Sequence, residues 1–188
     1  IEDLAQRSSS DPSNNKQKKW QEILLQQYLY LDMDAHALTF AKGLTQKDPL
    51  EPKWWKALSH IQLKANKLEK GLSALIIYGF LTPMTRDELV LAADLYLSLD
   101  APQKAASLYQ NVLKEKHSFE IIEKLIQAHI MAHDPKNAIM WIDKGLSSIT
   151  ETSKNQKRTT RLTHLKKQLE HMQKFYALAN AVLQSNPL

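Results

Sequence analysis

The sequence predicts an all-α fold, a right-handed α-solenoid of about four helix pairs followed by one long C-terminal capping helix. Three observations favour this class. Only 4 Gly occur among 188 residues, too few for the turns of a strand-rich fold, while helix-favouring residue types are plentiful. Apolar residues recur at every third or fourth position. The whole pattern also repeats with a period of 34 residues, as helical repeats do.

Composition restricts the chemistry more than the location. No apolar run approaches the roughly 18 residues that a membrane-spanning helix requires. The absence of Cys excludes disulfides, thiolate metal sites and Cys nucleophiles, yet it fits both the cytoplasm and an oxidising compartment. The chain begins at Ile1 rather than at Met, so an upstream secretory signal or anchor is one expectation.

The first predicted segment, residues 1–17, is a flexible leader. It contains Ser8, Ser9, Ser10 and Pro12 and has almost no apolar periodicity. Such a segment cannot bury enough surface to order itself. We therefore expect the first helix to begin at about residue 18.

Three columns of small or apolar residues define four repeats over residues 18–150. The columns, each spaced 34, 34 and 33 residues apart, are Ala37, Gly71, Ala105 and Ala138; Leu24, Leu58, Ala92 and Leu125; and Ala41, Leu75, Tyr109 and Ile142. Small residues let two helices approach closely, so each repeat is predicted to be a pair of amphipathic helices. The pairs are expected at 18–31 and 34–46, 52–65 and 68–81, 86–99 and 102–116, and 119–132 and 135–149.

Proline positions support these boundaries. Pro102 and Pro135 stand where second helices begin, and Pro49 and Pro83 follow the ends of earlier pairs. The first repeat is ambiguous. Trp20 lies 34 residues before Trp54, whereas Ala37 belongs to a frame in which Trp55 is the inward aromatic residue. A turn that differs by one residue in the first repeat would reconcile the two frames.

These residues resemble the tetratricopeptide repeat (TPR) family. The third repeat matches the family pattern best, and the second matches it at several positions. The matching residues are Leu89, Ala92, Ala93, Tyr96, Ala105 and Tyr109, and Trp55, Leu58, Ser59, Gly71, Leu75 and Pro83. Gln62 and His129 depart from it, because Tyr is usual at their positions, and Ile126 replaces a small residue. The resemblance implies the fold of residues 18–150 and a role in binding proteins, but no particular partner.

The stretch from Trp55 to Leu113 resembles, more specifically, TPR proteins associated with TonB–ExbB systems of Gram-negative bacteria. The similarity lies in Gly79-Phe80-Leu81-Thr82, Leu95-Tyr96-Leu97, Ala101-Pro102 and Lys104-Ala105-Ala106. It implies an exported, periplasmic protein that associates with a complex of the cell envelope. A cytoplasmic assembly adaptor is the alternative.

Residues 151–188 are predicted to form one long basic helix. Its apolar residues alternate by three and four, as Leu162, Leu165, Leu169, Met172, Tyr176, Ala179 and Leu183. We favour a cap on the last repeat, because stacked repeats need their terminal apolar face covered. The alternative is a coiled-coil seam that joins two chains in a homodimer.

Positive charge is concentrated in this last helix. Residues 154–188 hold 7 Lys or Arg and 1 acidic residue, against 18 and 19 in residues 1–153. The basic candidates are Lys154, Lys157, Arg158, Arg161, Lys166 and Lys167. We interpret them first as a solvated helix face, with an acidic protein or a membrane surface as alternatives. Nucleic acid is disfavoured, because no aromatic residue lies among them to stack on bases.

Motifs for catalysis or cofactor binding are not found. His129 and His133 are four residues apart, which suits metal binding on a helix, but no third ligand is evident. The sequence has no Gly-rich phosphate loop and no nucleophile elbow. We therefore predict no catalytic residue, metal or cofactor, and a protein that is not an enzyme.

The first helices of stacked pairs line a shared concave groove, which we expect to bind another protein or peptide. Three columns face it: Glu22, Lys56, Val90 and Glu123; Gln26, His60, Asp94 and Gln127; and the apolar Leu29, Leu63, Leu97 and Ile130. Core packing is the alternative role for the apolar column. An acidic C-terminal tail is rejected as the ligand, because Asp94 and Glu123 would repel a carboxylate.

Overall fold

The computed structural model describes residues 12–148 and 153–185, and the secondary structure of these residues is α-helical without any strand. The predicted all-α helical-repeat class is confirmed. The helices are α2 (Pro12–Tyr30), α3 (Asp34–Lys47), α4 (Pro52–Lys64), α5 (Leu68–Leu81), α6 (Arg86–Ser98), α7 (Pro102–Glu115), α8 (Phe119–Met131), α9 (Pro135–Ser147) and α10 (Ser153–Ser185). The right hand of the solenoid stays a prediction.

Helices α3 to α9 begin and end within two residues of the predicted positions. Helix α10 lies within the predicted residues 151–188, whereas the first helix begins earlier than predicted. Helix α2 begins at Pro12, so residues 12–17 are helical rather than part of a flexible leader. Proline suits the first turn of a helix, where its missing N–H is not needed, and the Lys and Gln that follow favour helix. The rest of the expected leader lies outside the described residues.

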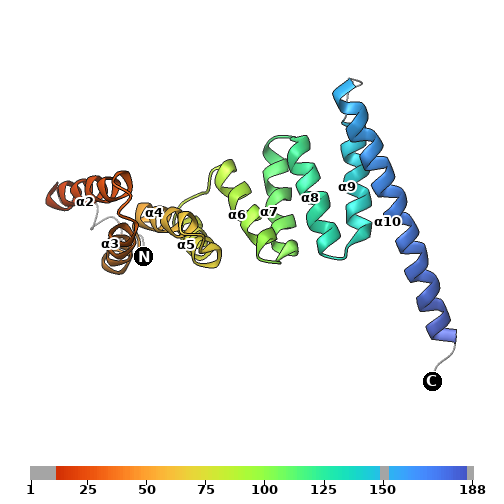
Figure 1. Ribbon diagram of the computed structural model, residues 1–188, viewed down its shortest axis with the longest axis horizontal. Helices are drawn as coiled ribbons and strands as arrows, with labels where there is room; N and C mark the ends of the chain where they lie inside the picture. The colour runs from red at the N-terminus through yellow and green to blue at the C-terminus, as the bar shows by residue number, and fades with distance from the viewer. Residues whose placement is uncertain (1–11, 149–152, 186–188) are drawn as a thin grey trace. The chain divides into compact units, whose positions relative to one another are not determined.

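The chain divides into two compact units, Ile1–Thr85 and Arg86–Leu188. In the first unit α2 packs on α3, α3 on α4, and α4 on α5. In the second unit each helix from α6 to α9 packs on the next, and α10 packs on α9 (Figure 1). Each unit is therefore a stack of antiparallel helices joined by short turns.

One turn geometry joins the two helices of every pair. Asp32, Asn66, Asp100 and His133 have φ between 53° and 55°, the left-handed region. They recur at the 34, 34 and 33 spacing of the columns. In each turn the next N–H bonds back to a carbonyl of the last helical turn, as from Met33 to Tyr28 at 2.9 Å, which satisfies carbonyls that a helix end leaves unpaired. The first turn has the same length as the others, so the predicted one-residue difference is wrong.

The frame ambiguity disappears because Trp54, not Trp55, is the inward aromatic residue. The Trp54 side chain is only 2% exposed. Trp55 is half-buried, and its indole Nε1 donates a hydrogen bond to the Pro49 carbonyl at 2.8 Å. Trp20 and Ala37 therefore belong to one frame with Trp54 and Gly71.

The predicted columns of small residues mark where paired helices approach. Ala37, Ala105 and Ala138 are completely buried. At Gly71 an added Cβ would lie 2.4 Å from Leu63 Cδ2 across the helix pair. Overlap at that distance would force Leu63 to move, which favours Gly over Ala at this position.

The first half of α10 closes the second unit. Leu162 and Leu169 are buried in the core of this unit, together with Tyr109, Ile122 and Leu125, and Leu165 packs at its edge. This contact is the predicted cap. Beyond it α10 exposes Met172, Phe175, Tyr176 and Leu178. Within residues 12–148 and 153–185, no helix is both long enough and apolar enough to cross a membrane.

Candidate functional site

The apolar column predicted for the groove serves mainly as core. Leu29 packs at the edge of the first unit's core, and Leu97 and Ile130 pack at the edge of the second unit's core. Leu63 fills the space beside Gly71. All four side chains are half-buried. The alternative role given by the sequence, packing against neighbouring helices, therefore accounts for Leu29, Leu63 and Leu97.

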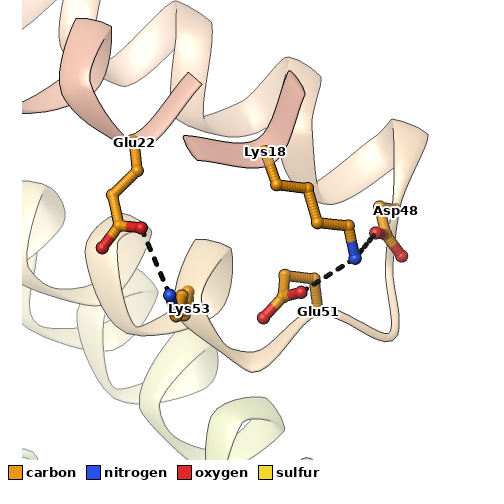
Figure 2. Close-up of polar contacts among 5 residues, drawn as sticks. All are labelled: Lys18, Glu22, Asp48, Glu51 and Lys53. Atoms are coloured by element: carbon orange, nitrogen blue, oxygen red, sulfur yellow. Dashed lines mark hydrogen bonds and ion pairs between the residues drawn. The ribbon is translucent and has the colours of Figure 1, made fainter. Parts of the chain in front are cut away.

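In the first unit, ion pairs join α2 to α4 and to the turn before α4 (Figure 2). Lys18 Nζ lies 2.8 Å from Asp48 and 2.9 Å from Glu51, and Lys53 Nζ lies 3.2 Å from Glu22. Burial alone would lower the pKa of Lys18, but the two carboxylates outweigh it and raise that pKa. The groove candidate Glu22 thus has a cation of its own chain beside it.

The other candidates of the first unit are spread over α2 and α4. Gln26 and His60 are exposed. The Lys56 ammonium lies 5.5 Å from the centre of the Tyr78 ring, a cation–π arrangement. The polar hollow between α2 and α4 measures about 290 Å³ and is lined by Lys18, Glu22, Glu51, Lys53 and other residues. Lys18 and Lys53 are paired with carboxylates of the same unit, and Lys19 is exposed at the hollow.

In the second unit, Asp94 joins three helices. Its carboxylate lies 2.8 Å from Lys124 Nζ of α8 and accepts a hydrogen bond from the Tyr109 hydroxyl of α7. Burial and then the bond to Asp94 raise the pKa of Tyr109. The negative charge of Asp94, which the sequence argument used against an acidic ligand, is therefore paired with Lys124 of the same unit. Val90, one turn earlier on α6, packs at the edge of the core.

A second groove of about 270 Å³ opens between α8 and α10. Its floor is apolar: Ile126 and Leu162 are buried, and Ile130 and Leu165 are half-buried. Its rim is polar and is formed by Glu120, Glu123, Lys124, Gln127 and Arg161. Arg161 Nη1 lies 3.8 Å from Glu123 Oε1 across the groove. The volume is below the roughly 300–1,000 Å³ of small-molecule sites and suits one or two apolar side chains.

This groove unites four predicted candidates with residues that were not predicted as part of a binding site. Glu123, Gln127 and Ile130 come from the three predicted columns, and Arg161 comes from the basic set. Leu162 and Leu165 were predicted only as cap residues. Their apolar periodicity was visible, but the sequence did not show that their helix lies beside α8.

Lys166 and Arg158, two of the six basic candidates of α10, contact other residues of the second unit. Lys166 Nζ lies 2.6 Å from Asp143, whose hydrogen bond raises the pKa of Lys166. The Arg158 guanidinium lies 4.8 Å from the centre of the Phe119 ring. Lys157 and Lys167 are exposed. The side chain of Lys154 lies outside the described part of the chain.

His129 and His133, whose spacing suits metal binding on a helix, lie in different environments. His129 is buried, and its Nδ1 lies 3.3 Å from Asp134 Oδ2. His133 is exposed in the left-handed turn position. Over the residues that the structure covers, no cluster of three or more His, Cys, Asp or Glu could hold a metal ion.

Asp134 caps α9, and its effect on stability depends on pH. Its Oδ1 accepts from the Asn137 backbone N–H at 3.1 Å. Burial alone would raise the pKa of Asp134, but the hydrogen bonds from Asn137 and the interaction with His129 lower it. The ionised Asp134 side chain therefore contributes its full stabilisation of the fold above the unfolded-state pKa of about 4. This contribution is lost as the pH falls through the lower pKa of the folded state.

We expect Asp134→Ala to lower the free energy of unfolding by about 1 kcal/mol at neutral pH. The difference from the unsubstituted chain should shrink at an acidic pH below the unfolded-state pKa of about 4, because the native carboxylate becomes protonated as the pH falls through its lowered pKa. Urea unfolding at the two pH values measures this. Asp134→Asn, which keeps a capping oxygen but no charge, is the control. An equal loss at both pH values would contradict the assignment.

Comparison with known proteins supports the fold. The chain matches no protein-family model and no curated protein. Among solved structures it is similar to MamA residues 41 to the end from Desulfovibrio magneticus RS-1, at 12% identity and a TM-score of 0.59, over 90% of this chain and 97% of that one. It is also similar to a tetratricopeptide repeat protein from Parabacteroides merdae ATCC 43184, at 20% identity and a TM-score of 0.59. This match covers 89% of this chain and 64% of that one.

A third similar chain belongs to the structure of Naa15/Naa10 bound to HypK-THB, at 14% identity and a TM-score of 0.70. The match covers 85% of this chain but only 24% of that one. At these identities the likenesses show the tetratricopeptide-like helical-repeat fold and nothing further. The association with TonB–ExbB systems stays a prediction.

Proposed function

We propose that the chain is a non-catalytic protein-interaction scaffold and that the groove between α8 and α10 binds a peptide segment of a partner. One observation carries the proposal. Ile126, Ile130, Leu162 and Leu165 form an apolar floor that is open between two helices and bordered by polar side chains. An apolar floor with a polar rim is the usual form of a peptide-binding groove.

The dimensions and charges of the groove indicate the kind of peptide. Burying one Leu-sized side chain contributes about 1.5–3 kcal/mol, so one or two anchors suffice for modest affinity. Arg161 is largely exposed and lies 3.8 Å from Glu123. A contact of this kind contributes little, so a ligand can replace it at small cost. Arg161 can then donate to a peptide carbonyl, while Glu123 accepts from a peptide N–H. We expect an apolar anchor in a segment of low net charge.

The alternatives from the sequence receive less support. A nucleic-acid site would use the basic residues of α10, but Lys166 and Arg158 contact Asp143 and Phe119 of the same unit. A metal site would use His129 and His133, which face different surroundings. The peptide groove, in contrast, is formed by residues that the structure places together between α8 and α10.

Selection from a library of random 12-residue peptides tests the groove. We expect enriched peptides to contain one or two large apolar residues. Gln127→Trp places a bulky side chain at the rim and should weaken their binding at least tenfold. Gln103→Trp, the same change at an exposed position on α7, is the matched control and should leave binding unchanged. Equal binding by both variants would contradict the proposal.

The finer proposal is that the scaffold assembles a complex in the envelope of a Gram-negative bacterium. It is supported by the resemblance of the stretch from Trp55 to Leu113 to proteins of TonB–ExbB systems. A cytoplasmic adaptor is the alternative. An alkaline phosphatase fusion to the complete gene product distinguishes the two, because this enzyme is active only after export. An inactive fusion, made in full amount, would favour the cytoplasmic adaptor.

A further inference from the structure

An exposed apolar stripe runs along helix α2 and includes Leu31, which directly follows the helix and continues its hydrogen-bond pattern through a bond from its N–H to the Gln27 carbonyl at 3.0 Å. Trp20, Leu24 and Leu31 are 64%, 42% and 59% exposed. Their spacings of four and seven place them on one face of the helix. Ile23 is exposed beside them. Large exposed apolar side chains that gather on one face mark an interaction surface more often than isolated ones do.

The repeat itself shows what this face is built to contact. The residues that correspond to Trp20 and Leu24 are Trp54 and Leu58 in α4, and Ile121 and Leu125 in α8. All four are buried. Trp54 and Leu58 share a core cluster with Ala37, Ala41 and Leu44 of the preceding helix α3, and α4 packs on α3. In α8, Ile121 and Leu125 share a cluster with residues of the preceding helix α7. The stripe on α2 therefore occupies positions that receive a helix elsewhere in the chain.

We propose that this stripe is the docking site for an acidic amphipathic helix of another protein, seated on α2 as α3 is seated on α4. Helices α3 and α7 have 14 residues each, so the seat accommodates a helix of about 21 Å at 1.5 Å per residue. This surface is separate from the α8/α10 groove, and the inference does not depend on that groove.

Charge selects an acidic partner. Lys16 and Lys19 are exposed and border Trp20 and Ile23. The other charged residues of α2 make contacts within the unit: Lys18 pairs with Asp48 and Glu51, and Glu22 pairs with Lys53. Asp32, which follows Leu31, pairs with Lys64. The charges that border Trp20 and Ile23 are therefore positive, and acidic residues flanking the apolar face of a docked helix would complement them there.

The same charges disfavour a second copy of the chain. Parallel pairing of α2 with α2 would bring Lys16 and Lys19 of both copies together. The other exposed apolar helix face is Met172, Phe175, Tyr176 and Leu178 of α10, and the C-terminal segment that bears it holds 7 Lys or Arg and 1 acidic residue. Both self-pairings place like charges side by side, which opposes association.

A hollow beside the stripe adds contact surface. It measures about 600 Å³, and Tyr28, His36 and Phe40 form part of its lining. The ring centres of His36 and Phe40 lie 5.9 and 5.8 Å from that of Tyr28. Two residues line the hollow from α2: Gln21 directly follows Trp20, and Tyr28 lies one helical turn beyond Leu24. Apolar side chains of a docked helix can therefore reach this aromatic wall.

Two helix-stabilised synthetic peptides test the proposal. One has the sequence of residues 102–115, the helix that packs on α8. The other carries Lys104→Glu and Lys114→Glu in that sequence, which makes it acidic. We expect the acidic peptide to bind the full chain at least tenfold more tightly at low salt, with the difference narrowing at high salt because added ions screen the lysines. Fluorescence anisotropy of labelled peptides measures both affinities.

Variants of the chain locate the binding. Trp20→Ser combined with Leu24→Ser should weaken binding of the acidic peptide at least tenfold. Tyr30→Ser is the matched control: Tyr30 is 82% exposed, and Lys64, Ser98 and Met131 at the corresponding positions are exposed too. Gln127→Trp should also leave binding unchanged, which separates this surface from the α8/α10 groove.

Three results would overturn the inference. These are no binding of either peptide, equal binding of both, or binding that survives the double substitution. Sedimentation velocity tests whether a second copy of the chain occupies the stripe instead. A concentration-dependent dimer of the chain that disappears on Trp20→Ser and Leu24→Ser would assign the stripe to a second copy instead.

Discussion

Replacing Tyr109 by Ala is expected to lower the free energy of unfolding of the second unit by about 3–5 kcal/mol. Tyr109 is the largest of the completely buried side chains, and it lies in the same core cluster as Ile122, Leu125 and Ile142. Its removal leaves a cavity between α7 and its neighbours and deprives Asp94 of a hydrogen-bond donor. Few single changes in this chain remove as many contacts.

Tyr109→Phe separates the two contributions. It keeps the ring and removes only the hydroxyl, so we expect a loss of about 1.5–3 kcal/mol, the range for a hydrogen bond to a charged group. Asp94 keeps Lys124 as its partner. Urea unfolding followed by circular dichroism, with Trp141 as the fluorescent probe of the second unit, measures both variants. A loss below about 1 kcal/mol for Tyr109→Ala would contradict the described core.

Replacing Ala105 by Leu is expected to lower the free energy of unfolding by about 1–3 kcal/mol, because it overpacks the contact between paired helices. Ala105 is completely buried and belongs to the column that also contains Gly71. Thermal unfolding measures the effect. Ala177→Leu, at an exposed position of α10, is the matched control and should change stability little. An unchanged melting temperature for Ala105→Leu would show that the repeat register is misplaced.

Much of the fold could be predicted because each repeat carries its own start and stop signals. Pro102 and Pro135 mark the first residues of α7 and α9, and the small-residue columns fix the pairing. The left-handed turn positions were not predicted, although Asp, Asn and His are among the residues that tolerate that conformation. The early start of α2 was missed, because its Ser and Asn residues resemble those of a loop.

The candidate site was predicted less completely, because its charges pair between residues distant in sequence. Lys124 binds Asp94 from 30 positions away, and Lys18 is equally far from Asp48. Periodicity places a residue on a helix face but does not say which charge lies opposite it. Predicting the groove between α8 and α10 would also have required knowing how α10 lies against α8. The repeat columns do not include α10, so they could not show this. For the same reason the exposed Trp20 looked like an ordinary core residue.

Amide hydrogen exchange of the chain, alone and with a peptide selected from the library, tests the central claim most directly. The claim is that the groove between α8 and α10 binds a partner segment. It predicts slower exchange in residues 120–130 and 161–165 when the peptide is bound, with little change in α3 and α5. A bound peptide that slows exchange only outside α8 and α10 would contradict it.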